Sequence, residues 1–279
     1  MNRINIHSAE RAKIATNERV KINNSYSFWT PDDIMSELYL WHDLSDASTL
    51  TLNGNGIVTA SDKSPNGIDV TQSTASNQPT LQSNYANGLS AGYFDRAAEQ
   101  QLFYQGDGFD HPSTNGPSYD FSMFYIVEPI ARGSKYTSIV SYNTSHNRDW
   151  QIDDPVDKGL LRTSNIANSR IKVNNTNIGN RLGIVRVDWN FSGNSIKTYY
   201  NGVTHYGTTV KDLMDKLGVT FRYGVNRNNS SFLTMYLGEV LFVPYRFRLK
   251  TEGYLAWKWG LQSQLPNTHL YKSSKPLNN

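Results

Sequence analysis

Residues 182–202 read LGIVRVDWNFSGNSIKTYYNG. Within this stretch Val185, Val187 and Trp189 alternate with polar side chains, and a period of two is typical of a strand with one buried face. A short polar loop leads into a second run of strand-forming residues, so the two runs predict an antiparallel hairpin. The Asn-Gly pair at residues 201–202 predicts a second tight turn, because both residues tolerate the positive φ angles of such turns.

Short apolar runs separated by turn-forming residues continue on both sides of this stretch. The run FSMFYIVE at residues 121–128 is almost continuously apolar, which predicts a buried central strand. The run FLTMYLGEVLFV at residues 232–243 predicts a long strand in which Gly238 marks a bulge or a close backbone approach. Residues 45–67 are expected to form turns, and a polar hairpin is expected between residues 94 and 101. Further strands are expected at Leu38–Leu44, Gly92–Phe94, Gln101–Tyr104, Ser138–Tyr142, Leu160–Arg162 and Val219–Val225. The pattern predicts a sandwich or barrel of antiparallel strands.

One segment near the C-terminus departs from the strand pattern. Residues 250–265 read KTEGYLAWKWGLQSQL, and their apolar positions fit one face of a helix. Thr251 is the expected N-cap, and Pro266 is expected to stop the helix. Trp257 and Trp259 cannot share one helix face. One of them is therefore expected to anchor the helix in the core, and the other to cover the sheet edge or the start of the domain.

The composition excludes several classes of protein. The 279 residues are 38% hydrophobic, 12% aromatic and 18% charged, whereas disordered chains lack aromatic residues and carry more net charge. No run of about 18 apolar residues is present, so neither a transmembrane helix nor a membrane partner is expected. The chain has no cysteine, which excludes disulfides, thiolate zinc sites and cysteine nucleophiles.

Residues 1–28 are expected to form an N-terminal arm ahead of a single domain at residues 29–279. The arm holds five basic and two acidic side chains, which equals the net charge of +3 for the whole chain. It is interpreted either as a solvated extension or, preferably, as a segment that docks on a partner protein. Nucleic acid is not an expected partner, because the aromatic residues that stack on bases are not interleaved in the arm. The arm has no apolar signal-peptide core, so the chain is expected to be made in the cytoplasm and to stay there until lysis.

Two blocks of sequence resemble a known family. The opening block holds WTPDD at residues 29–33 and LYLWHDLSDAST at residues 38–49, and VTASDKSPNG follows it at residues 58–67. The closing block begins with EGYLAWKWGL at residues 252–261 and continues to HLY at residues 269–271. Together the blocks resemble the concanavalin A-like lectin/glucanase (laminin-G-like) jelly roll that occurs in many bacteriophage virion proteins and some bacterial surface proteins.

This resemblance covers about residues 29–272 and implies an all-β fold. The expected architecture is a two-sheet antiparallel jelly-roll sandwich with one short C-terminal helix, preceded by the extended arm. The resemblance implies a non-enzymatic structural protein of the phage virion, either a head decoration or a tail or fibre component. Such a protein would reside in the virion and dock on other virion proteins through the arm, as a monomer or an oligomer. The alternative is a carbohydrate-binding adhesin that recognises glycans on the host surface.

The richest acidic stretch is DWQIDDPVD at residues 149–157. Calcium prefers several oxygen ligands, and Asp153, Asp154 and Asp157 could supply them, although their spacing differs from that of an EF-hand loop. The competing interpretation is a solvated acidic loop without any ligand. Calcium is therefore the one cofactor that the sequence brings into consideration.

A glycan is the second candidate ligand for this region. Tyr142 or Trp150 would provide a stacking platform, and Asn147 or Asp153 would bond sugar hydroxyls. Loops on a rigid sandwich commonly carry binding surfaces, which favours this part of the chain as a binding site.

Catalysis is not expected from the sequence. Glucanases of the resembled fold use a run of the form E-x-D-x-x-E, and retaining enzymes hold their two carboxyl groups about 5–5.5 Å apart. The sequence has no such run, and Glu239 is the only carboxylate in its predicted strand. The histidines form no H-x-x-x-H or H-x-H pair that would indicate a metal site. A glucanase-type hydrolase is the least favoured of the three functions considered.

Overall fold

The computed structural model describes residues 27–105, 120–131, 139–143, 149–153, 160–164, 170–172, 181–190, 195–209, 220–226 and 229–278. The strands are β1 (Leu40–Asp43), β2 (Leu50–Asn53), β3 (Gly56–Ala60), β4 (Val70–Thr71), β5 (Thr80–Ala86), β6 (Leu89–Phe94), β7 (Leu102–Gln105), β8 (Phe121–Ala131), β9 (Val140–Asn143), β10 (Asp149–Asp153), β11 (Leu160–Ser164), β12 (Arg170–Lys172), β13 (Gly183–Asn190), β14 (Ser195–Tyr200), β15 (Val203–Thr209), β16 (Thr220–Tyr223) and β17 (Thr234–Pro244). The helical elements are the 3-10 helices η1 (Pro31–Glu37), η2 (Ala47–Thr49), η3 (Ala75–Asn77), η5 (Tyr245–Phe247) and η6 (Gln262–Gln264), and the α-helix α2 (Arg248–Lys258).

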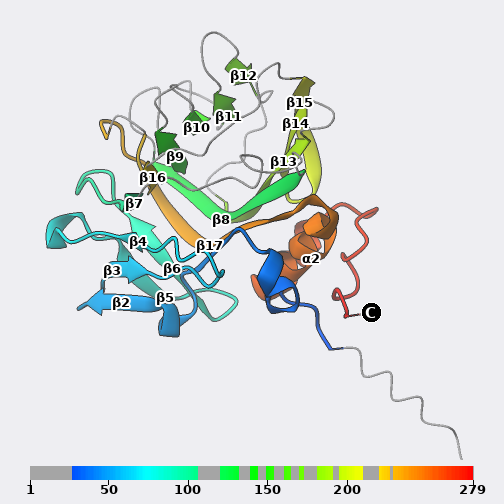
Figure 1. The fold of residues 1–279 in the computed structure, drawn as a ribbon, viewed down its shortest axis with the longest axis horizontal. Coiled ribbons are helices and arrows are strands. Elements are labelled where there is room, and N and C mark those ends of the chain that lie inside the picture. The colour runs from blue at the N-terminus through cyan, green and yellow to red at the C-terminus, as the bar shows by residue number, and fades with distance from the viewer. Residues whose placement is uncertain are drawn as a thin grey trace, which may run out of the picture.

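The described strands pair antiparallel in two sheets (Figure 1). The large sheet follows the order β15-β14-β13-β8-β17-β6-β5-β3-β4-β7-β16-β9, while β1 pairs with β17 and β2 with β3 beside this path. Strands from both halves of the path contribute to one hydrophobic core, so the sheet folds back on itself as the two layers of a sandwich. The small sheet of β10, β11 and β12 lies on the side of the molecule away from α2 (Figure 1). The predicted all-β antiparallel sandwich with one short C-terminal helix is confirmed.

Strand β8 is the buried central strand that its apolar sequence predicted. It lies between β13 and β17 in the large sheet. Met123 and Tyr125 face the core between the two layers, whereas Phe124 and Ile126 face a second core, which also contains Leu255 of α2. Both faces of β8 are covered, which explains why its sequence is apolar at nearly every position.

The hairpin predicted around the Asn-Gly turn is present. β13 pairs with β14 so that Val185 lies opposite Tyr200. Asn201 and Gly202 have φ angles of 48° and 78°, the left-handed region that the tight turn into β15 requires. The Asn201 side chain also accepts a hydrogen bond from the backbone N–H of Ile184 (2.8 Å), which ties the turn to β13.

Strand β17 carries the irregularity that its glycine predicted. Its register with β8 shifts between Leu237 and Val240, and Gly238 and Glu239 occupy the interruption. A Cβ atom on Gly238 would overlap the ring of Trp259. Glycine at this position therefore lets the segment that follows α2 pack directly on the sheet.

The helix α2 begins earlier and ends sooner than predicted. Thr251 is not the N-cap, since it lies inside the helix and its hydroxyl donates to the carbonyl oxygen of Phe247 (3.0 Å). Gly260 adopts a φ of 72° just after the helix, which is the left-handed conformation that commonly ends helices. The helix therefore stops at this glycine and does not reach Pro266.

The two tryptophans near the end of α2 have different roles, as their spacing predicted. Trp259 is buried in the core beneath the helix. Trp257 is only partly buried, and its indole N–H donates to the carbonyl oxygen of Tyr271 (2.9 Å). Trp257 thus holds the C-terminal segment, whereas the sequence had suggested the sheet edge or the opening block.

One local prediction was incomplete and one was wrong. The turns expected within residues 45–67 are present at residues 53–56 and 64–67, but the first of them joins an antiparallel pair, β2–β3, that was not predicted. Most of β2 is exposed, so its sequence lacks the apolar positions that mark a half-buried strand. Strands β6 and β7 do not form the expected hairpin with each other: among the described strands, β6 pairs with β5 and β17, and β7 pairs with β4 and β16. The positions of β6 and β7 are therefore set by their pairing with other strands and not by a turn between them.

The first described residues lie beside the C-terminal segment (Figure 1). Phe28 forms a bridge with Leu277, and the backbone N–H of Trp29 donates to the carbonyl oxygen of Pro276 (2.9 Å). None of the helices in the described part of the chain is long and apolar enough to cross a membrane.

Candidate functional site

Three tyrosines from three strands meet on one face of the large sheet. Tyr85 of β5, Tyr93 of β6 and Tyr236 of β17 form this tyrosine cluster, and Glu128 of β8 lies beside it. Tyr236 lies directly opposite Tyr93 on one side and Glu128 on the other in the strand registers. The residues before and after Tyr236 point into the main core, so its own side chain points to the opposite face, which also carries α2.

The rings of the cluster contact one another. Tyr85 and Tyr236 are stacked, with ring centroids 4.1 Å apart and an angle of 21° between the planes. Tyr93 is tilted by 47° against Tyr236 at a centroid distance of 5.0 Å. All three side chains are half-buried, so each ring is held in place by its neighbours and still presents surface to solvent.

A carboxylate is joined to the cluster by a hydrogen bond. The Tyr85 hydroxyl donates to Oε2 of Glu128, which is itself half-buried. The hydroxyls of Tyr93 and Tyr236 have no hydrogen-bond acceptor among the described residues. Two phenol hydroxyls and a carboxylate are therefore available on the same surface as the aromatic rings.

Burial keeps the phenols neutral. It raises the pKa of the Tyr85 hydroxyl, and the Glu128 carboxylate raises it further. Burial likewise raises the pKa of Tyr93, with a smaller contribution from Asp95. A phenol with a raised pKa keeps its proton throughout the physiological range, so these hydroxyls act as hydrogen-bond donors as well as acceptors.

A fourth tyrosine, Tyr200 of β14, packs against the main core and so faces the other side of the sheet. The ring of Tyr200 lies over Gly183, where a Cβ atom would collide with it. Its hydroxyl donates to the carbonyl oxygen of Arg181 (3.0 Å). Burial raises the pKa of Tyr200 to about 12. The tyrosine cluster on the face of α2 therefore consists of Tyr85, Tyr93 and Tyr236.

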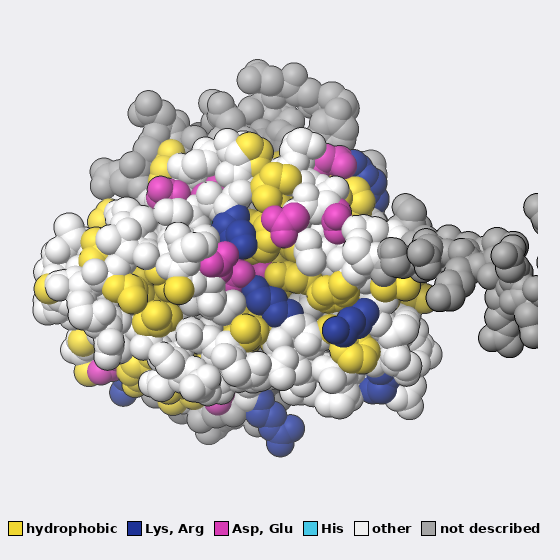
Figure 2. Space-filling model, turned by 90° about the horizontal axis from the view of Figure 1, so that it is seen from below, with side chains coloured by type: hydrophobic (Ala, Val, Ile, Leu, Met, Phe, Trp, Pro, Cys, Tyr) yellow, Lys and Arg dark blue, Asp and Glu magenta, His cyan; other side chains and the backbone are white. Residues whose placement is uncertain are grey.

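The tyrosine cluster is fixed against the end of α2. The β5–β6 turn reaches the helix, where Asn87 Nδ2 donates to the carbonyl oxygen of Lys258 (2.8 Å). Tyr85 and Tyr236 pack against the core beneath α2. Figure 2 shows the face seen from below in Figure 1, where hydrophobic side chains are exposed among other surface, and Lys, Arg, Asp and Glu side chains gather near the centre.

The buried carboxylates near α2 have a different role. Glu239, which is completely buried, accepts from the indole N–H groups of Trp41 (2.8 Å) and Trp259 (3.0 Å). It also pairs with the ammonium group of Lys258 (2.8 Å), which pairs with Asp43 as well (2.6 Å). Burial and the neighbouring Asp43 raise the pKa of Glu239. These contacts join the opening and closing blocks of the sequence, so the residues that carry the family resemblance serve the fold.

A second buried group of charges holds the other side of α2. The guanidinium of Arg186 on β13 pairs with Glu252 of the helix and lies 3.2 Å from Asp188. His269 of the C-terminal segment contacts the same Glu252 oxygen at 3.1 Å. These carboxylates are committed to ion pairs between the helix, the sheet and the C-terminal segment.

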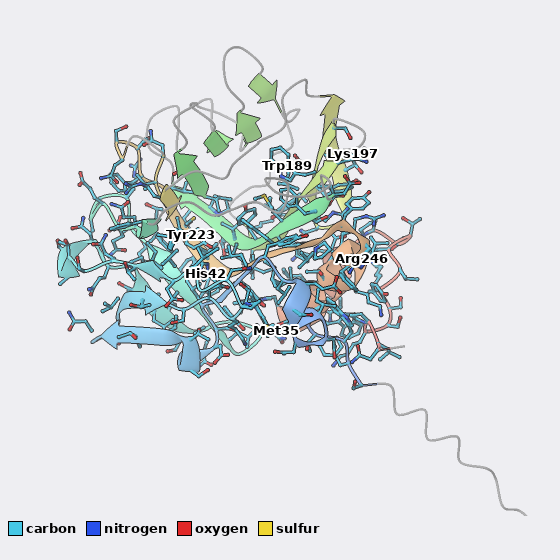
Figure 3. The ribbon with its side chains drawn as sticks, viewed as in Figure 1. Met35, His42, Trp189, Lys197, Tyr223 and Arg246 are labelled. Carbon is cyan, nitrogen blue, oxygen red and sulfur yellow. The ribbon has the colours of Figure 1, made fainter. Side chains whose placement is uncertain are left out.

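His42 is the fully buried histidine of the main core. Figure 3 shows it beside Tyr223, inside the sandwich. Its Nε2 lies 2.8 Å from the carbonyl oxygen of Ile68, which can only accept, so Nε2 carries the proton and Nδ1 accepts from the Tyr223 hydroxyl (2.7 Å). Burial lowers the pKa of His42. The ring is a neutral bridge between the two layers.

The structure describes only part of the site predicted from the sequence. Tyr142 lies on β9, and Trp150 and Asp153 lie on β10, but their side chains are outside what is described. Asn147, Asp154 and Asp157 lie outside the described residues. The glycan site and the calcium site in this region therefore stay predictions. Among the described residues, no group of three or more metal-ligating side chains is present.

The sequence analysis did not find the tyrosine cluster. Tyr85 and Tyr93 lie on the consecutive strands β5 and β6, but Tyr236 and Glu128 come from strands that are distant in the sequence and adjacent to them only in the sheet. The sequence offers one local indication of these residues. Tyr93 and Tyr236 each stand between residues that face the main core, and because side chains alternate along a strand, each tyrosine must lie on the opposite face.

Comparison with known proteins links the chain to other structures through its fold. No family model matches the chain, and no curated protein is significantly similar to it in sequence. Among solved structures, the binding domain of botulinum neurotoxin serotype D is similar with a TM-score of 0.51 and 14% identity, over 76% of this chain and 49% of that one. The binding domain of Paraclostridial Mosquitocidal Protein 1 gives a TM-score of 0.50 and 14% identity, over 75% of this chain and 49% of that one. The chain thus spans about half the length of these structures and shares with them a β-sandwich fold.

Proposed function

We propose that this chain is a non-enzymatic, lectin-like binding module whose ligand is carbohydrate on a host surface. The observation that carries the proposal is the tyrosine cluster with its attached carboxylate, half-exposed on the sheet face beside α2. The solved structures that share the fold are binding domains. A structural likeness at 14% sequence identity, however, supports only a shared fold and not a shared function. The function is therefore argued from the site.

Sugars need both of the surfaces that this cluster provides. Their C–H faces pack on aromatic rings, and their hydroxyls exchange hydrogen bonds with polar groups at the ring edges. Tyr93 and Tyr236 offer ring surface together with phenol hydroxyls, and Glu128 adds a strong acceptor. The rings support one another by contact, so few side-chain rotamers have to be frozen when a ligand binds.

A hydrolytic role has less support. A glycosidase needs two carboxyl groups on either side of the bond that it cleaves. The buried carboxylates near α2, Glu239 and Glu252, are engaged by cations and indole N–H groups of the fold. Because these carboxylates already bind other groups of the protein, ligand binding is favoured over hydrolysis.

Glycan binding can be tested by screening the full chain on a glycan array and measuring positive ligands by calorimetry. Tyr236→Ala is expected to weaken binding by roughly tenfold or more, since it removes the central ring. Tyr236→Phe, which keeps the ring, should retain most of the affinity. Tyr245→Ala is the matched control, because Tyr245 is also a half-buried tyrosine but lies in η5 outside the cluster.

The same screen separates this site from the one predicted around residues 142–153. If Trp150→Ala abolishes binding while Tyr236→Ala leaves it unchanged, the ligand occupies the region predicted from the sequence. If no glycan of a broad array binds to the intact chain, the proposed function is wrong.

We further propose that the protein is part of a phage virion. The family resemblance of the opening and closing blocks supports this proposal. The first described residues are fixed beside the C-terminal segment, so an arm at residues 1–28 would leave the domain from a defined point. Docking of this arm on other virion proteins would leave the tyrosine cluster free for host glycans. Mass spectrometry of purified particles, with and without deletion of residues 1–28, tests this: the truncated chain should be missing from the particles.

A further inference from the structure

We infer that the tyrosine cluster selects neutral glycans and discriminates against glycans that carry a carboxylate or a sulfate. This inference rests on the proposed function and specifies its ligand class. It follows from the charges that face the cluster, which are negative on two sides.

The first negative charge is Glu128. Its carboxylate lies at the hydroxyl of Tyr85 and opposite Tyr236 in the strand register, so it faces any ligand that rests on these rings. An ionised carboxylate is an acceptor only, and the oxygen atoms that Tyr85 leaves unused suit the hydroxyl donors of a sugar. A ligand carboxylate or sulfate offers no proton for such a bond.

The second negative charge is Asp95, at the end of β6. Asp95 lies two residues after Tyr93, directly beyond β6, and it adds to the effect of burial in raising the pKa of the Tyr93 hydroxyl. An anionic ligand on Tyr93 and Tyr236 would therefore stand between two like charges. Because the cluster is half-buried, these charges are screened less than they would be in open solvent.

Three basic residues bear on this charge balance. Lys258, at the end of the adjacent α2, is held by Asp43 and Glu239 and is largely buried. Arg181 is exposed, and its carbonyl oxygen accepts from the Tyr200 hydroxyl. Arg96 is exposed and directly follows Asp95 in the chain. Arg181→Ala and Arg96→Ala would reveal an anion drawn to either arginine.

The experiment compares paired glycans that share one core and differ only in a terminal acid, such as lactose and sialyllactose. Calorimetry on the full chain at low and high salt should give neutral members at least tenfold tighter binding than their acidic partners, with a smaller ratio at high salt. Glu128→Gln keeps the shape of the side chain and removes its charge, so it should bring the ratio close to one. Glu37→Gln, which neutralises an exposed glutamate outside the cluster, should leave the ratio unchanged.

The outcomes are distinguishable. Equal or tighter binding of the acidic members, or a ratio that Glu128→Gln does not change, overturns the inference while glycan binding itself stands. Loss of acid binding in Arg181→Ala with no effect of Glu128→Gln would also overturn it. If neither member of any pair binds, or if Tyr236→Ala has no effect on binding, the proposed function fails and the inference fails with it. Melting curves of Glu128→Gln verify that the variant is folded.

Discussion

Trp41 and Trp259, which belong to the opening and the closing block of the sequence, donate their indole N–H groups to opposite oxygens of one buried carboxylate, Glu239. Lys258 neutralises this carboxylate from α2. The bulge of β17 provides Glu239, and that strand lies outside both blocks. The two blocks therefore meet through a third segment, and this meeting point holds α2 and β1 against the sheet.

Replacing Glu239 by glutamine is expected to lower the free energy of unfolding by about 3 kcal/mol, because it breaks a buried ion pair from one side. The amide keeps the shape of the side chain, but its NH2 group would confront another donor, the Lys258 ammonium or the Trp259 N–H. Urea unfolding of the two proteins measures the difference. The matched control is Glu37→Gln, since the Glu37–Arg246 pair is largely exposed and its loss should cost less than about 1 kcal/mol. Equal losses in both variants would contradict this role for Glu239.

Gly238→Ala is expected to lower the free energy of unfolding by about 1–3 kcal/mol, because its Cβ atom would overlap the Trp259 ring. Thermal and urea unfolding measure the loss. In a Trp259→Phe background the smaller ring leaves room for the methyl group, so the alanine should cost less there than in the wild type. A cost that is the same in both backgrounds would show that the glycine is required for its backbone and not for the contact.

His42 should make the stability of the protein depend on pH. Burial lowers the pKa of His42 in the folded state, while the unfolded chain has the ordinary value of 6.5. Below pH 6.5 the unfolded chain therefore binds a proton at this histidine, whereas the folded state does not. The free energy of unfolding consequently falls as the pH is lowered. At pH values above 6.5 this contribution is fully present. Unfolding free energies at pH 7.5 and pH 5.5 should differ more for the wild type than for His42→Gln, which cannot titrate.

The opposite result, a larger difference in His42→Gln, would mean that the folded state accepts the proton more readily than the unfolded chain. Replacing Tyr223 by phenylalanine tests the bridge independently. It leaves Nδ1 of His42 without its donor and should lower stability at pH 7.5 by about 1 kcal/mol or more.

The elements that could be predicted from the sequence are those whose signals are local. The alternation of Val185, Val187 and Trp189 follows the face of β13 that packs in the main core, while the polar residues between them are buried on the other face; the turn at residues 201–202 depends only on two backbone conformations. These features are correct in the structure. The N-cap of α2 was misplaced because Thr251 bonds a carbonyl within the helix, which a threonine does as readily as it caps a helix end.

The candidate site could not be predicted in the same way. Tyr93 and Tyr236 become neighbours only because β6 pairs with β17, and this pairing is set by the fold of the whole sheet. Along the chain Tyr93 stands beside Phe94 and Tyr236 stands within a long apolar run, and neither position belongs to a recognisable binding motif. A site at residues 142–157 was proposed because acidic and aromatic residues are adjacent in the sequence there, and such contiguity can be read without knowledge of the fold.

The boundary between the arm and the domain leads to a prediction about truncation. Trp29 is buried, packs against Phe247 with ring centroids 6.3 Å apart, and is bonded to the C-terminal segment through its backbone. Deletion of residues 1–26 removes none of these contacts and should leave the melting temperature unchanged. Deletion of residues 1–29 removes the Trp29 side chain from the core, at a cost of about 3 kcal/mol or more, and should lower the melting temperature by at least roughly 6 °C.

Scanning calorimetry on the full chain, the two truncations and the point variant Trp29→Ala separates the contributions. The point variant should reproduce most of the loss seen on deleting residues 1–29, because both remove the same buried side chain. A large loss on deleting residues 1–26 alone would mean that the arm is part of the stabilising structure. The arm could not then be the independent docking segment that its basic sequence suggested, and the domain would have to begin earlier than residue 27.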